Sequence, residues 1–151
     1  MTLKLRRATV EDFPFAKAVH HSSYREWVVD QFGAWDEGLQ DRYFQESWDR
    51  WPYDIIEIDG RPVGFSAVEH AHDATHLREF ALHGEFQGRG IGAAYLGSLV
   101  NEFHRPQKPV RLRVFKANQR AIALYRRIGF AETGTTDLQV LFEWPNHVGL
   151  P

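Results

Sequence analysis

The feature that most constrains this chain is a glycine-rich segment directly before an amphipathic helix. The segment reads Gln87-Gly88-Arg89-Gly90-Ile91-Gly92. The helix that follows has an apolar stripe with i, i+3, i+4, i+7 spacing, made of Leu96, Leu99, Val100 and Phe103. Glycines let backbone amides crowd around an anion, and a helix N-terminus adds free N–H groups and partial positive charge. The sequence therefore predicts a phosphate-binding loop, since a plain helix-entry turn needs only one glycine.

Apolar periodicity and turn signals predict an alternation of strands and helices around this loop. A first strand at about residues 3–8 precedes a helix that is capped at Asp12 and runs to about His21. A second helix is expected from Glu37 to Trp48, and a last, short one begins at the Asn118 cap and stops at Gly129. Further strands are expected at Asp54–Ile58, Pro62–Glu69, His76–Leu82, Val110–Phe115 and Leu138–Trp144. The order β-α-α-β-β-β-α-β-α-β indicates an α+β, mixed-sheet domain.

Composition limits the class of protein. The 151 residues suffice for one domain with its own core, so we expect a single domain over residues 1–151. The absence of cysteine excludes a disulfide framework, a thiolate zinc site and a cysteine nucleophile. A net charge of −2 argues against broad nucleic-acid binding, and no apolar run is long enough for a membrane span. The N-terminus lacks the apolar core of a signal peptide, so a cytoplasmic protein is expected.

Two familiar nucleotide-binding loops do not fit the glycine segment. A P-loop needs Gly-x-x-x-x-Gly-Lys-Ser/Thr, but no Lys-Ser or Lys-Thr follows the glycines. A Rossmann fingerprint needs Gly-x-Gly-x-x-Gly at the opening of a βαβ unit. Here the segment from Gly88 to Gly92 has a different spacing and follows a hairpin-rich half of the chain. Neither nucleotide-binding class is therefore retained.

A third pattern fits. The segment Gln87–Gly92 resembles the Gln/Arg-x-x-Gly-x-Gly/Ala loop of the GNAT superfamily, the acetyl-CoA-dependent N-acetyltransferases. Residues 80–83, Phe-Ala-Leu-His, resemble the end of that family's fourth strand, and residues 118–130 resemble its second cofactor motif. The hairpin at residues 59–64 is also typical of the family. The resemblance covers roughly residues 54 to 130 and implies a GNAT-like central, mixed and mostly antiparallel twisted sheet of about six to seven strands, flanked by about four helices.

The resemblance implies that acetyl-CoA is the acyl donor and that no metal is needed. The backbone amides of the loop would hold the CoA pyrophosphate, and they belong to Gln87, Gly88, Arg89, Gly90, Ile91 and Gly92. The pantetheine arm would lie along Phe80–Leu82 like an added strand, with the Leu82 N–H facing the thioester oxygen, where an amide donor stabilises developing negative charge. Asn118 would approach the cofactor arm, although its place as a helix cap explains it nearly as well.

Tyr125 is the candidate acid. Its position matches the tyrosine that protonates the departing CoA thiolate in many family members. A phenol normally keeps its proton at pH 7 and can therefore act as an acid. The alternative is that Tyr125 only belongs to the apolar stripe with Leu124 and Ile128.

Two residues are candidates for the base that deprotonates the amine acceptor. In the family this role falls to an acid or histidine on the fourth strand, and here His76 and Glu79 precede Leu82 by six and three residues. Strand alternation puts His76 on the face of Phe80 and Leu82, and Glu79 on the other face unless a bulge intervenes. Histidine titrates near neutrality, whereas Glu79 would need a raised pKa or a water relay. Both candidates remain open, and direct transfer in a ternary complex is expected because no thiol could carry the acyl group.

The resemblance implies an acceptor pocket built largely from the first two helices and the closing strands, which here includes the stretch from Tyr24 to Glu37. It combines aromatic and acidic residues, namely Tyr24, Trp27, Phe32 and Trp35 with Glu26, Asp30, Asp36 and Glu37. Rings and carboxylates together suit an amine with an apolar body, a small molecule or a peptide or protein amine, although core rings and surface acids are the plain alternative. His70, His72 and His76 do not indicate a metal site, because a polar turn accounts for the first two. A homodimer stays open, and a non-catalytic acetyl-CoA-binding module is the alternative function.

Overall fold

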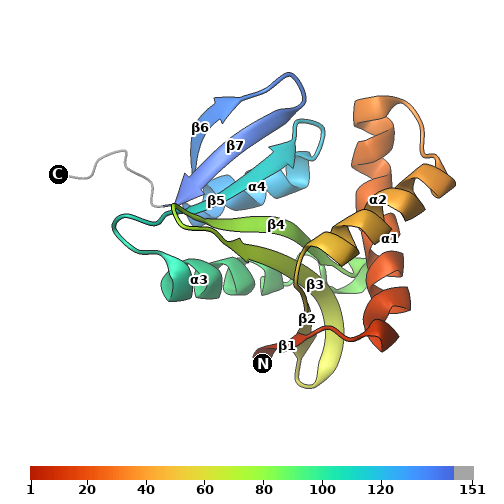
Figure 1. Cartoon of the computed structure of the whole chain (residues 1–151), viewed down its shortest axis with the longest axis horizontal. Coiled ribbons are helices and arrows are strands. Elements are labelled where there is room, and N and C mark those ends of the chain that lie inside the picture. Colours follow the sequence, from red (N-terminus) through yellow and green to blue (C-terminus); the bar gives the residue numbers. More distant parts are fainter. Residues whose placement is uncertain (145–151) are drawn as a thin grey trace. The chain divides into compact units, whose positions relative to one another are not determined.

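The structure is a computed structural model that describes residues 1–144, in which seven strands, four α-helices and two 3-10 helices are present. The strands are β1 (Leu3–Arg7), β2 (Tyr53–Ile58), β3 (Arg61–His70), β4 (Thr75–Leu82), β5 (Val110–Phe115), β6 (Ala131–Thr135) and β7 (Gln139–Trp144) (Figure 1). The helices are α1 (Phe13–Phe32), α2 (Glu37–Arg50), α3 (Ile91–Phe103) and α4 (Gln119–Ile128), with 3-10 turns η1 (Val10–Asp12) and η2 (Gly84–Phe86).

The strands are hydrogen-bonded in the order β1-β2-β3-β4-β5-β7-β6. The pair β4–β5 is parallel, whereas β1–β2, β2–β3, β5–β7 and β6–β7 are antiparallel. The expected α+β class, with a mixed, mostly antiparallel sheet of six to seven strands and four helices, is therefore confirmed.

The chain divides into two compact units, and the first comprises residues 1–68 and 78–89. It contains β1, β2, α1, α2, most of β3 and the end of β4. Its core joins both helices to one sheet face: Ala16 and Val19 of α1 and Phe44 of α2 pack with residues of three strands, namely Tyr53, Ile55, Phe65, Ala67 and Ala81. Burial of these apolar side chains holds α1 and α2 against the strands.

The second unit comprises Glu69–Leu77 and the chain from Gly90 onward. The first residues of β4 pair with β5 in parallel, from Thr75 opposite Val110 to Leu77 opposite Leu112. The apolar stripe of α3 is buried, including Leu96, Leu99 and Val100. Helices α3 and α4 contact each other, as expected for two helices that share one core.

Helix α1 is longer than the sequence predicts. The helix begins after Asp12, as expected, but the Asp12 side chain does not cap it and instead accepts from the Thr9 N–H at 2.8 Å. The helix continues past His21 to Phe32 and ends at Gly33, whose φ of +86° suits only glycine. The expected end was wrong because the second half of α1 carries apolar residues on more than one face, which hides the helical period. Of these residues, Val28 is buried whereas Val29 and Phe32 are exposed.

Strand β6 is absent from the element order predicted from the sequence. Its five residues, Ala-Glu-Thr-Gly-Thr, show no apolar alternation and include a glycine. The pairing of β6 with β7 shifts register between Glu132 and Gly134, so even the local period of two is interrupted. Pairing with the more apolar β7, which follows it directly along the chain, forms this strand.

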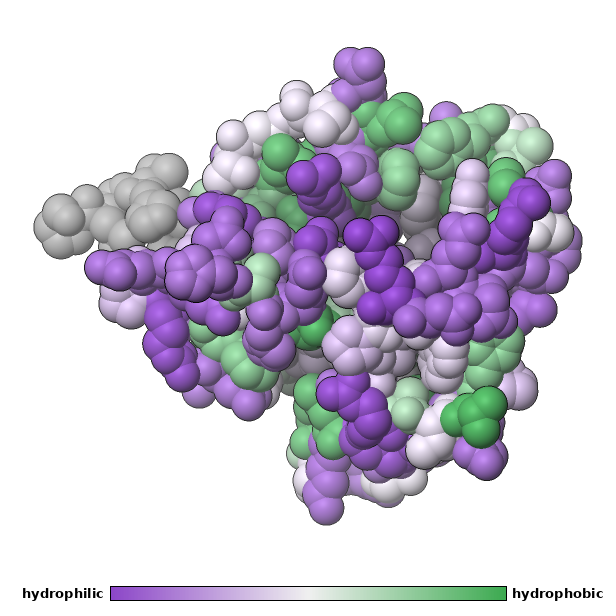
Figure 2. Space-filling model, in the orientation of Figure 1, coloured by the Kyte–Doolittle hydropathy of each residue, from purple (hydrophilic) through white to green (hydrophobic). Residues whose placement is uncertain are grey.

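Exposed apolar side chains of the described residues come from several elements. Figure 2 shows mainly hydrophilic residues on the face it draws, with smaller hydrophobic groups between them. Large apolar side chains that are exposed include Val10, Phe32 and Tyr43, which lie on different elements. Within residues 1–144, no helix combines the length and the apolar character that crossing a membrane requires.

Candidate functional site

The glycine segment connects β4 to α3 and passes twice through left-handed backbone conformations. Gly88 has a φ of +74° and Gly90 a φ of +81°, which residues with a Cβ rarely adopt. Gly90 is the N-cap of α3, and its carbonyl accepts a hydrogen bond from the Ala94 N–H at 3.0 Å. The first-turn N–H groups of α3 have no acceptor within the helix. Apart from chain neighbours, no described atom lies within 4 Å of a Cβ built at either glycine, so a ligand has room to approach this backbone.

The start of the loop is tied to the end of β4 through Leu82. The Gln87 side chain donates from Nε2 to the Leu82 carbonyl oxygen at 3.0 Å, and the Ser23 hydroxyl of α1 donates to the same oxygen at 3.0 Å. The next amide, that of His83, donates to the carbonyl of Val63 on β3 at 2.8 Å. The peptide that follows Leu82 is therefore fixed from α1, from β3 and from the loop itself.

Gly64 on β3 is a second close approach at the end of β4, and the sequence analysis did not single it out. A Cβ built there would lie 2.2 Å from the carbonyl oxygen of Ala81 and 2.9 Å from Cδ2 of Leu82. The signal that could have found it is a glycine inside an apolar strand, Val63-Gly64-Phe65.

Positive charge gathers beside the loop. The Arg89 guanidinium lies 5.5 Å from the ring centroid of Phe86, and the Arg61 guanidinium lies 5.3 Å from the same centroid. A carboxylate of Glu85 lies 3.7 Å from Arg61. Two cations next to a helix-capping glycine segment favour an anionic ligand there.

Helix α4 holds the two candidates from the second motif. Asn118 is its N-cap, and Oδ1 of Asn118 accepts from the Ala121 N–H at 3.3 Å, so the capping role is confirmed. Tyr125 is 7% exposed, and its ring packs against Phe130 and Phe142 with centroids 5.9 Å away in each case. Tyr125 therefore belongs to the apolar stripe of α4, and a catalytic role would be additional to this packing.

Glu79 of β4 lies in a cluster of hydroxyl groups. The Tyr24 hydroxyl of α1 donates to Oε2 of Glu79 at 2.5 Å, and the Ser47 hydroxyl of α2 donates to Oε1 at 3.3 Å. Ser47 in turn lies 2.7 Å from the hydroxyl of Tyr53 on β2. Ser47 and Tyr53 escaped the sequence analysis, because only the fold brings α2 and β2 to this carboxyl.

The surroundings of Glu79 raise its pKa. Burial opposes the charged form and raises the pKa, while the hydroxyl hydrogen bonds from Tyr24 and Ser47 lower it in part. Burial also raises the pKa of Tyr53, and the nearby charge of Glu79 adds to this, so Tyr53 stays a neutral hydroxyl donor. The sequence analysis required a raised pKa for Glu79 to act as a base, and its surroundings in the fold do raise this pKa.

His76, the other candidate base, lies near the start of β4. It is opposite Arg111 in the parallel pairing with β5 and is partly buried. Along one strand, side chains three residues apart point to opposite faces, so His76 does not share the face on which Glu79 contacts Tyr24 and Ser47.

Two neighbouring histidines of α1 form a separate cluster. Nδ1 of His20 lies 2.9 Å from Nδ1 of His21, and Nε2 of His21 lies 2.7 Å from Oδ1 of Asp41 on α2. His20 is 5% exposed, and burial together with the neighbouring His21 lowers the pKa of His20 to about 3. His20 is therefore neutral, and its ring lies 4.1 Å from that of Tyr24, centroid to centroid, with the two planes tilted by 46°. The sequence analysis treated the pair as a helix end and missed this contact.

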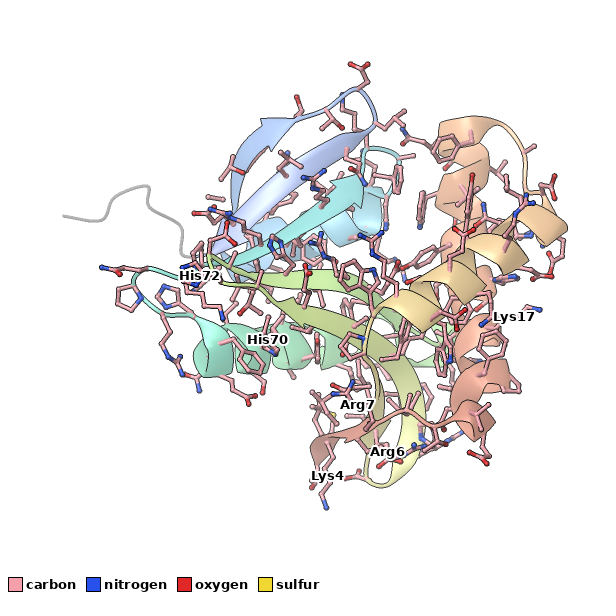
Figure 3. All side chains as sticks on the ribbon, viewed as in Figure 1. Lys4, Arg6, Arg7, Lys17, His70 and His72 are labelled. Atoms are coloured by element: carbon pink, nitrogen blue, oxygen red, sulfur yellow. The ribbon has the colours of Figure 1, made fainter. Side chains whose placement is uncertain are left out.

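Within residues 1–144, the group that could hold a metal ion is His21 with Glu37 and Asp41. Lys17, which projects from α1 in Figure 3, already pairs with one of these carboxylates. Its ammonium lies 3.1 Å from Asp41. His70 and His72 do not join this group, and the His70 ring packs on Phe103 with centroids 4.5 Å apart.

The aromatic and acidic residues proposed for the acceptor region divide into different environments. Tyr24 is held on Glu79, and its ring lies 5.2 Å from that of Trp27. The Trp35 indole donates to Glu37 at 2.6 Å, and Asp36 caps α2. Phe32, Glu26 and Asp30 are exposed. The sequence offered two interpretations of these aromatic and acidic residues: core rings with surface acids, or an aromatic recognition surface. Each interpretation applies to some of them.

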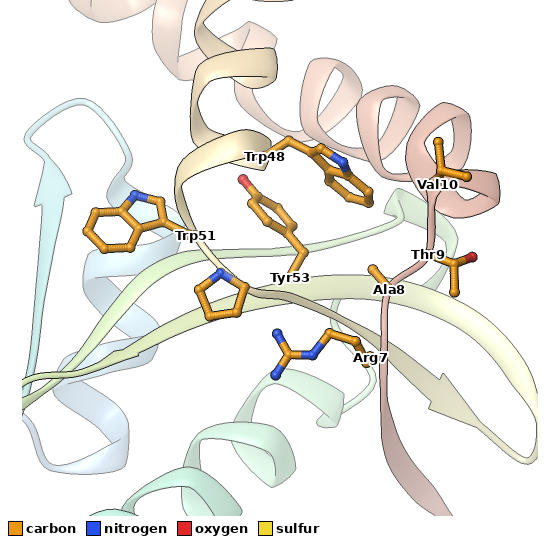
Figure 4. Close-up of a pocket in the computed structure, with 8 residues that line it drawn as sticks. Arg7, Ala8, Thr9, Val10, Trp48, Trp51 and Tyr53 are labelled. Atoms are coloured by element: carbon orange, nitrogen blue, oxygen red, sulfur yellow. The ribbon is translucent and has the colours of Figure 1, made fainter.

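A cavity of about 240 Å³ lies in the first unit between the end of β1 and the end of α2 (Figure 4). Figure 4 shows the rings of Trp48 and Tyr53 side by side at this cavity, with centroids 5.0 Å apart. Arg7 also lines it and forms a 3.5 Å ion pair with Asp54. None of the sequence-predicted site residues lines this cavity.

Comparison with known proteins identifies related sequences. The sequence model of the acetyltransferase (GNAT) family matches residues 21–130. An uncharacterized N-acetyltransferase of Methanocaldococcus jannaschii is 25% identical over 151 aligned positions, which cover 87% of this chain and 62% of that protein. The chain thus spans less than two thirds of the length of this relative. The [ribosomal protein bS18]-alanine N-acetyltransferase of Salmonella typhimurium is 28% identical over 107 positions, covering 70% of this chain and 72% of that protein.

Solved structures share the fold. The PaiA N-acetyltransferase of Thermoplasma acidophilum, in complex with coenzyme A, superposes with a TM-score of 0.70 at 16% sequence identity. The match covers 95% of this chain and 98% of that one. Likeness at this level of identity concerns the fold alone.

Proposed function

This chain belongs to the GNAT family of acetyltransferases, and from that membership we propose that it transfers an acetyl group from acetyl-CoA directly to an amine acceptor in a ternary complex. The observation that carries the proposal is the glycine segment, with Gly88 and Gly90 at positive φ before the N-terminus of α3. The family match draws residues from both compact units, which supports treating residues 1–151 as one N-acetyltransferase-like domain.

The residues of the loop fit the CoA pyrophosphate. We assign the backbone N–H groups of residues 87–92 to this anion, because a helix N-terminus and left-handed glycines present several donors to one point. The charges of Arg61 and Arg89 favour the same ligand. A solved relative that shares the fold holds coenzyme A, which supports the choice of ligand. When bound, acetyl-CoA supplies the activated acyl group.

Leu82 is the proposed oxyanion donor. Its N–H would face the thioester oxygen and stabilise the negative charge that develops there. The bonds from Ser23 and Gln87 to the Leu82 carbonyl support this assignment, because a donor for a transition state must be held in place in advance. Asn118 would contact the cofactor arm through its side-chain Nδ2, since its Oδ1 caps α4 and its backbone N–H donates to the Phe115 carbonyl.

Glu79 is the proposed base, with His76 as the alternative. A carboxylate acts well as a general base when its pKa is close to the working pH, which is above the ordinary pKa of a glutamate. Burial raises the pKa of Glu79 toward that range. The N–H bond of the ammonium breaks, the proton binds a Glu79 oxygen, and the electron pair stays on nitrogen to attack the carbonyl carbon. The C–S bond of the adduct then breaks with its electron pair on sulfur, and Tyr125 gives its phenolic proton to the departing thiolate. The second proton on the adduct nitrogen passes to the Tyr125 phenolate, which restores the phenol and leaves a neutral amide.

The acceptor is proposed to be a primary amine with an apolar body. The partly buried rings of Tyr24, Trp27 and Trp35, beside acids at the surface, support this class. One relative is named for acetylating an alanine of a ribosomal protein, which makes a protein or peptide amine the acceptor class to test first. A non-catalytic acetyl-CoA-binding module remains the second candidate function.

Calorimetric titration with acetyl-CoA tests the donor assignment. Saturable binding is expected, and Gly90→Trp is expected to abolish it, because a side chain there forces an unfavourable φ and fills the space above the amides. Gly60→Trp is the matched control, since Gly60 has a φ of +80° and open space in the β2–β3 turn. No binding by the folded protein, or binding that survives Gly90→Trp, would rule out the loop as the acetyl-CoA site.

Release of CoA thiol with a panel of peptide and small amines then separates an enzyme from a binding module. Glu79→Gln and His76→Asn distinguish the two bases. If Glu79 is the base, Glu79→Gln removes most turnover. His76→Asn then leaves the acid limb of the pH profile of kcat/KM unchanged. The reverse pattern would assign the role to His76, and binding without turnover for any amine would favour the module.

A further inference from the structure

We propose that Tyr24 and Ser47 are positioning residues for Glu79: their hydroxyl groups fix the carboxylate in one orientation and leave Oε1 as the oxygen that receives the amine proton. The inference rests on the proposed function, because it takes Glu79 as the base. It adds two residues from two helices to the reaction, and neither would touch the reacting atoms.

Two hydroxyl groups fix the Glu79 carboxylate, one at each of its oxygens. Each carboxylate oxygen of Glu79 receives one hydroxyl group, Oε2 from Tyr24 of α1 and Oε1 from Ser47 of α2. The last torsion of a glutamate has a broad energy profile, so the side chain itself does not select one orientation of the carboxylate. Two donors on separate helices favour a single orientation. The orientation of the carboxylate plane therefore depends on how α1 and α2 pack.

The two oxygens are not equivalent. The 2.5 Å bond from Tyr24 engages Oε2 strongly, whereas the bond from Ser47 to Oε1 is longer, at 3.3 Å. Ser47 has a single proton, which it gives to Glu79, so Tyr53 must be the donor in the 2.7 Å contact between Tyr53 and Ser47. The weaker bond leaves Oε1 with more of its basicity, and the ammonium proton moves to that oxygen.

The groups that contact Glu79, directly or through one neighbour, come from three elements, α1, α2 and β2. Helix α1 supplies Tyr24 and, behind it, the neutral His20. Helix α2 supplies Ser47 and strand β2 supplies Tyr53. On β4 itself the adjacent Arg78 places its guanidinium over the ring of Trp51 at 4.9 Å. The causes that lower the pKa of Glu79 against burial are the hydroxyl bonds, so removing a hydroxyl must raise that pKa.

Carbon-13 NMR of the glutamate carboxyl groups measures this directly, without any catalytic turnover. Loss of one signal in Glu79→Gln assigns the resonance. We expect Tyr24→Phe to raise the titration midpoint of Glu79 by about 0.5 to 1 pH unit and Ser47→Ala to raise it by less, in the order of the two bond lengths. Ser47→Thr keeps the hydroxyl and should restore the wild-type midpoint.

Matched controls separate this effect from a general loss of packing. Tyr43→Phe removes a hydroxyl from an exposed residue of α2, and Ser22→Ala removes one that donates to the Val19 carbonyl on α1. Neither should move the Glu79 midpoint. If Tyr24→Phe does not fold, Ser47→Ala and its Thr rescue carry the test alone.

The pH profile of kcat/KM is the second measurement. Its acid limb should move upward by the same amount as the NMR midpoint, while the KM for acetyl-CoA stays unchanged. An unchanged midpoint in both variants, or an equal shift in the controls, would overturn the inference. If the midpoint shifts in a protein that transfers no acetyl group, the role of Tyr24 and Ser47 in fixing the carboxylate is supported and only the proposed function is contradicted. If the protein transfers acetyl groups but the midpoint does not shift, only the inference is contradicted.

Discussion

The carbonyl oxygen of Ala81 lies so close to Gly64 that a Cβ built on this glycine would be 2.2 Å from it. Real Cβ atoms do not approach a backbone oxygen to this distance, so β3 and the end of β4 have their observed spacing only because residue 64 is glycine. The neighbouring Leu82 is the proposed oxyanion donor. The spacing of β3 and β4 therefore decides where that N–H stands.

Gly64→Ala is expected to lower the free energy of unfolding by about 1 to 3 kcal/mol, because the backbone must shift to admit the methyl group. Urea unfolding measures the change. Gly97→Ala is the control, since a Cβ at this position of α3 meets open space, and alanine is the better helix former. An equal or higher stability of Gly64→Ala would contradict the close approach.

The sequence was sufficient to predict the parts of the fold with strong local signals. The Asn118 cap, the Gly129 stop and the strand Val110–Phe115 are confirmed with the expected bounds. These elements are specified by capping chemistry and alternation within a few residues. Strand β6 and the second half of α1 were not predicted, because their own residues show no clear apolar period.

The same distinction applies to the candidate site. The glycine loop could be read locally, because positive φ at Gly88 and Gly90 is a property of the residues themselves. The surroundings of Glu79 could not, since Tyr24, Ser47 and Tyr53 come from segments 26 to 55 residues away and meet only through packing. Sequence alternation left His76 and Glu79 equal. The hydroxyl cluster is what favours Glu79.

Glu79→Gln is expected to make the protein less sensitive to alkaline pH. The folded state raises the pKa of Glu79, whereas the unfolded chain ionises it near 4.5, the ordinary value. Between these two pKa values the folded state binds more protons, so wild-type stability falls as pH rises through this window and levels off above it. The variant lacks this loss. Urea midpoints should agree near pH 4 and favour the variant at pH 8; parallel curves would contradict the raised pKa.

His20 predicts an acid-sensitive contribution of the opposite sign. Its folded pKa is lowered to about 3, whereas the unfolded chain takes up a proton near 6.5. Stability is therefore fully present above pH 6.5 and is lost as the pH falls toward 3. His20→Phe, placed among the rings of Tyr24 and Phe44, should flatten this part of the urea midpoint profile. His72→Asn, at an exposed position, should leave the slope as in the wild type.

Tyr125→Phe separates the packing role of this ring from its proposed chemical role. Phenylalanine keeps the contacts with Phe130 and Phe142, so urea stability and acetyl-CoA binding should stay close to wild type. The loss of a general acid is expected to lower kcat about 100-fold, since the thiolate must then leave without a proton. Steady-state release of CoA thiol measures kcat, with Tyr43→Phe at an exposed site of α2 as the matched control. Full turnover in Tyr125→Phe would show that the ring serves only the core, and another proton donor would have to be sought; a fall in kcat with unchanged stability would assign the hydroxyl to the leaving group.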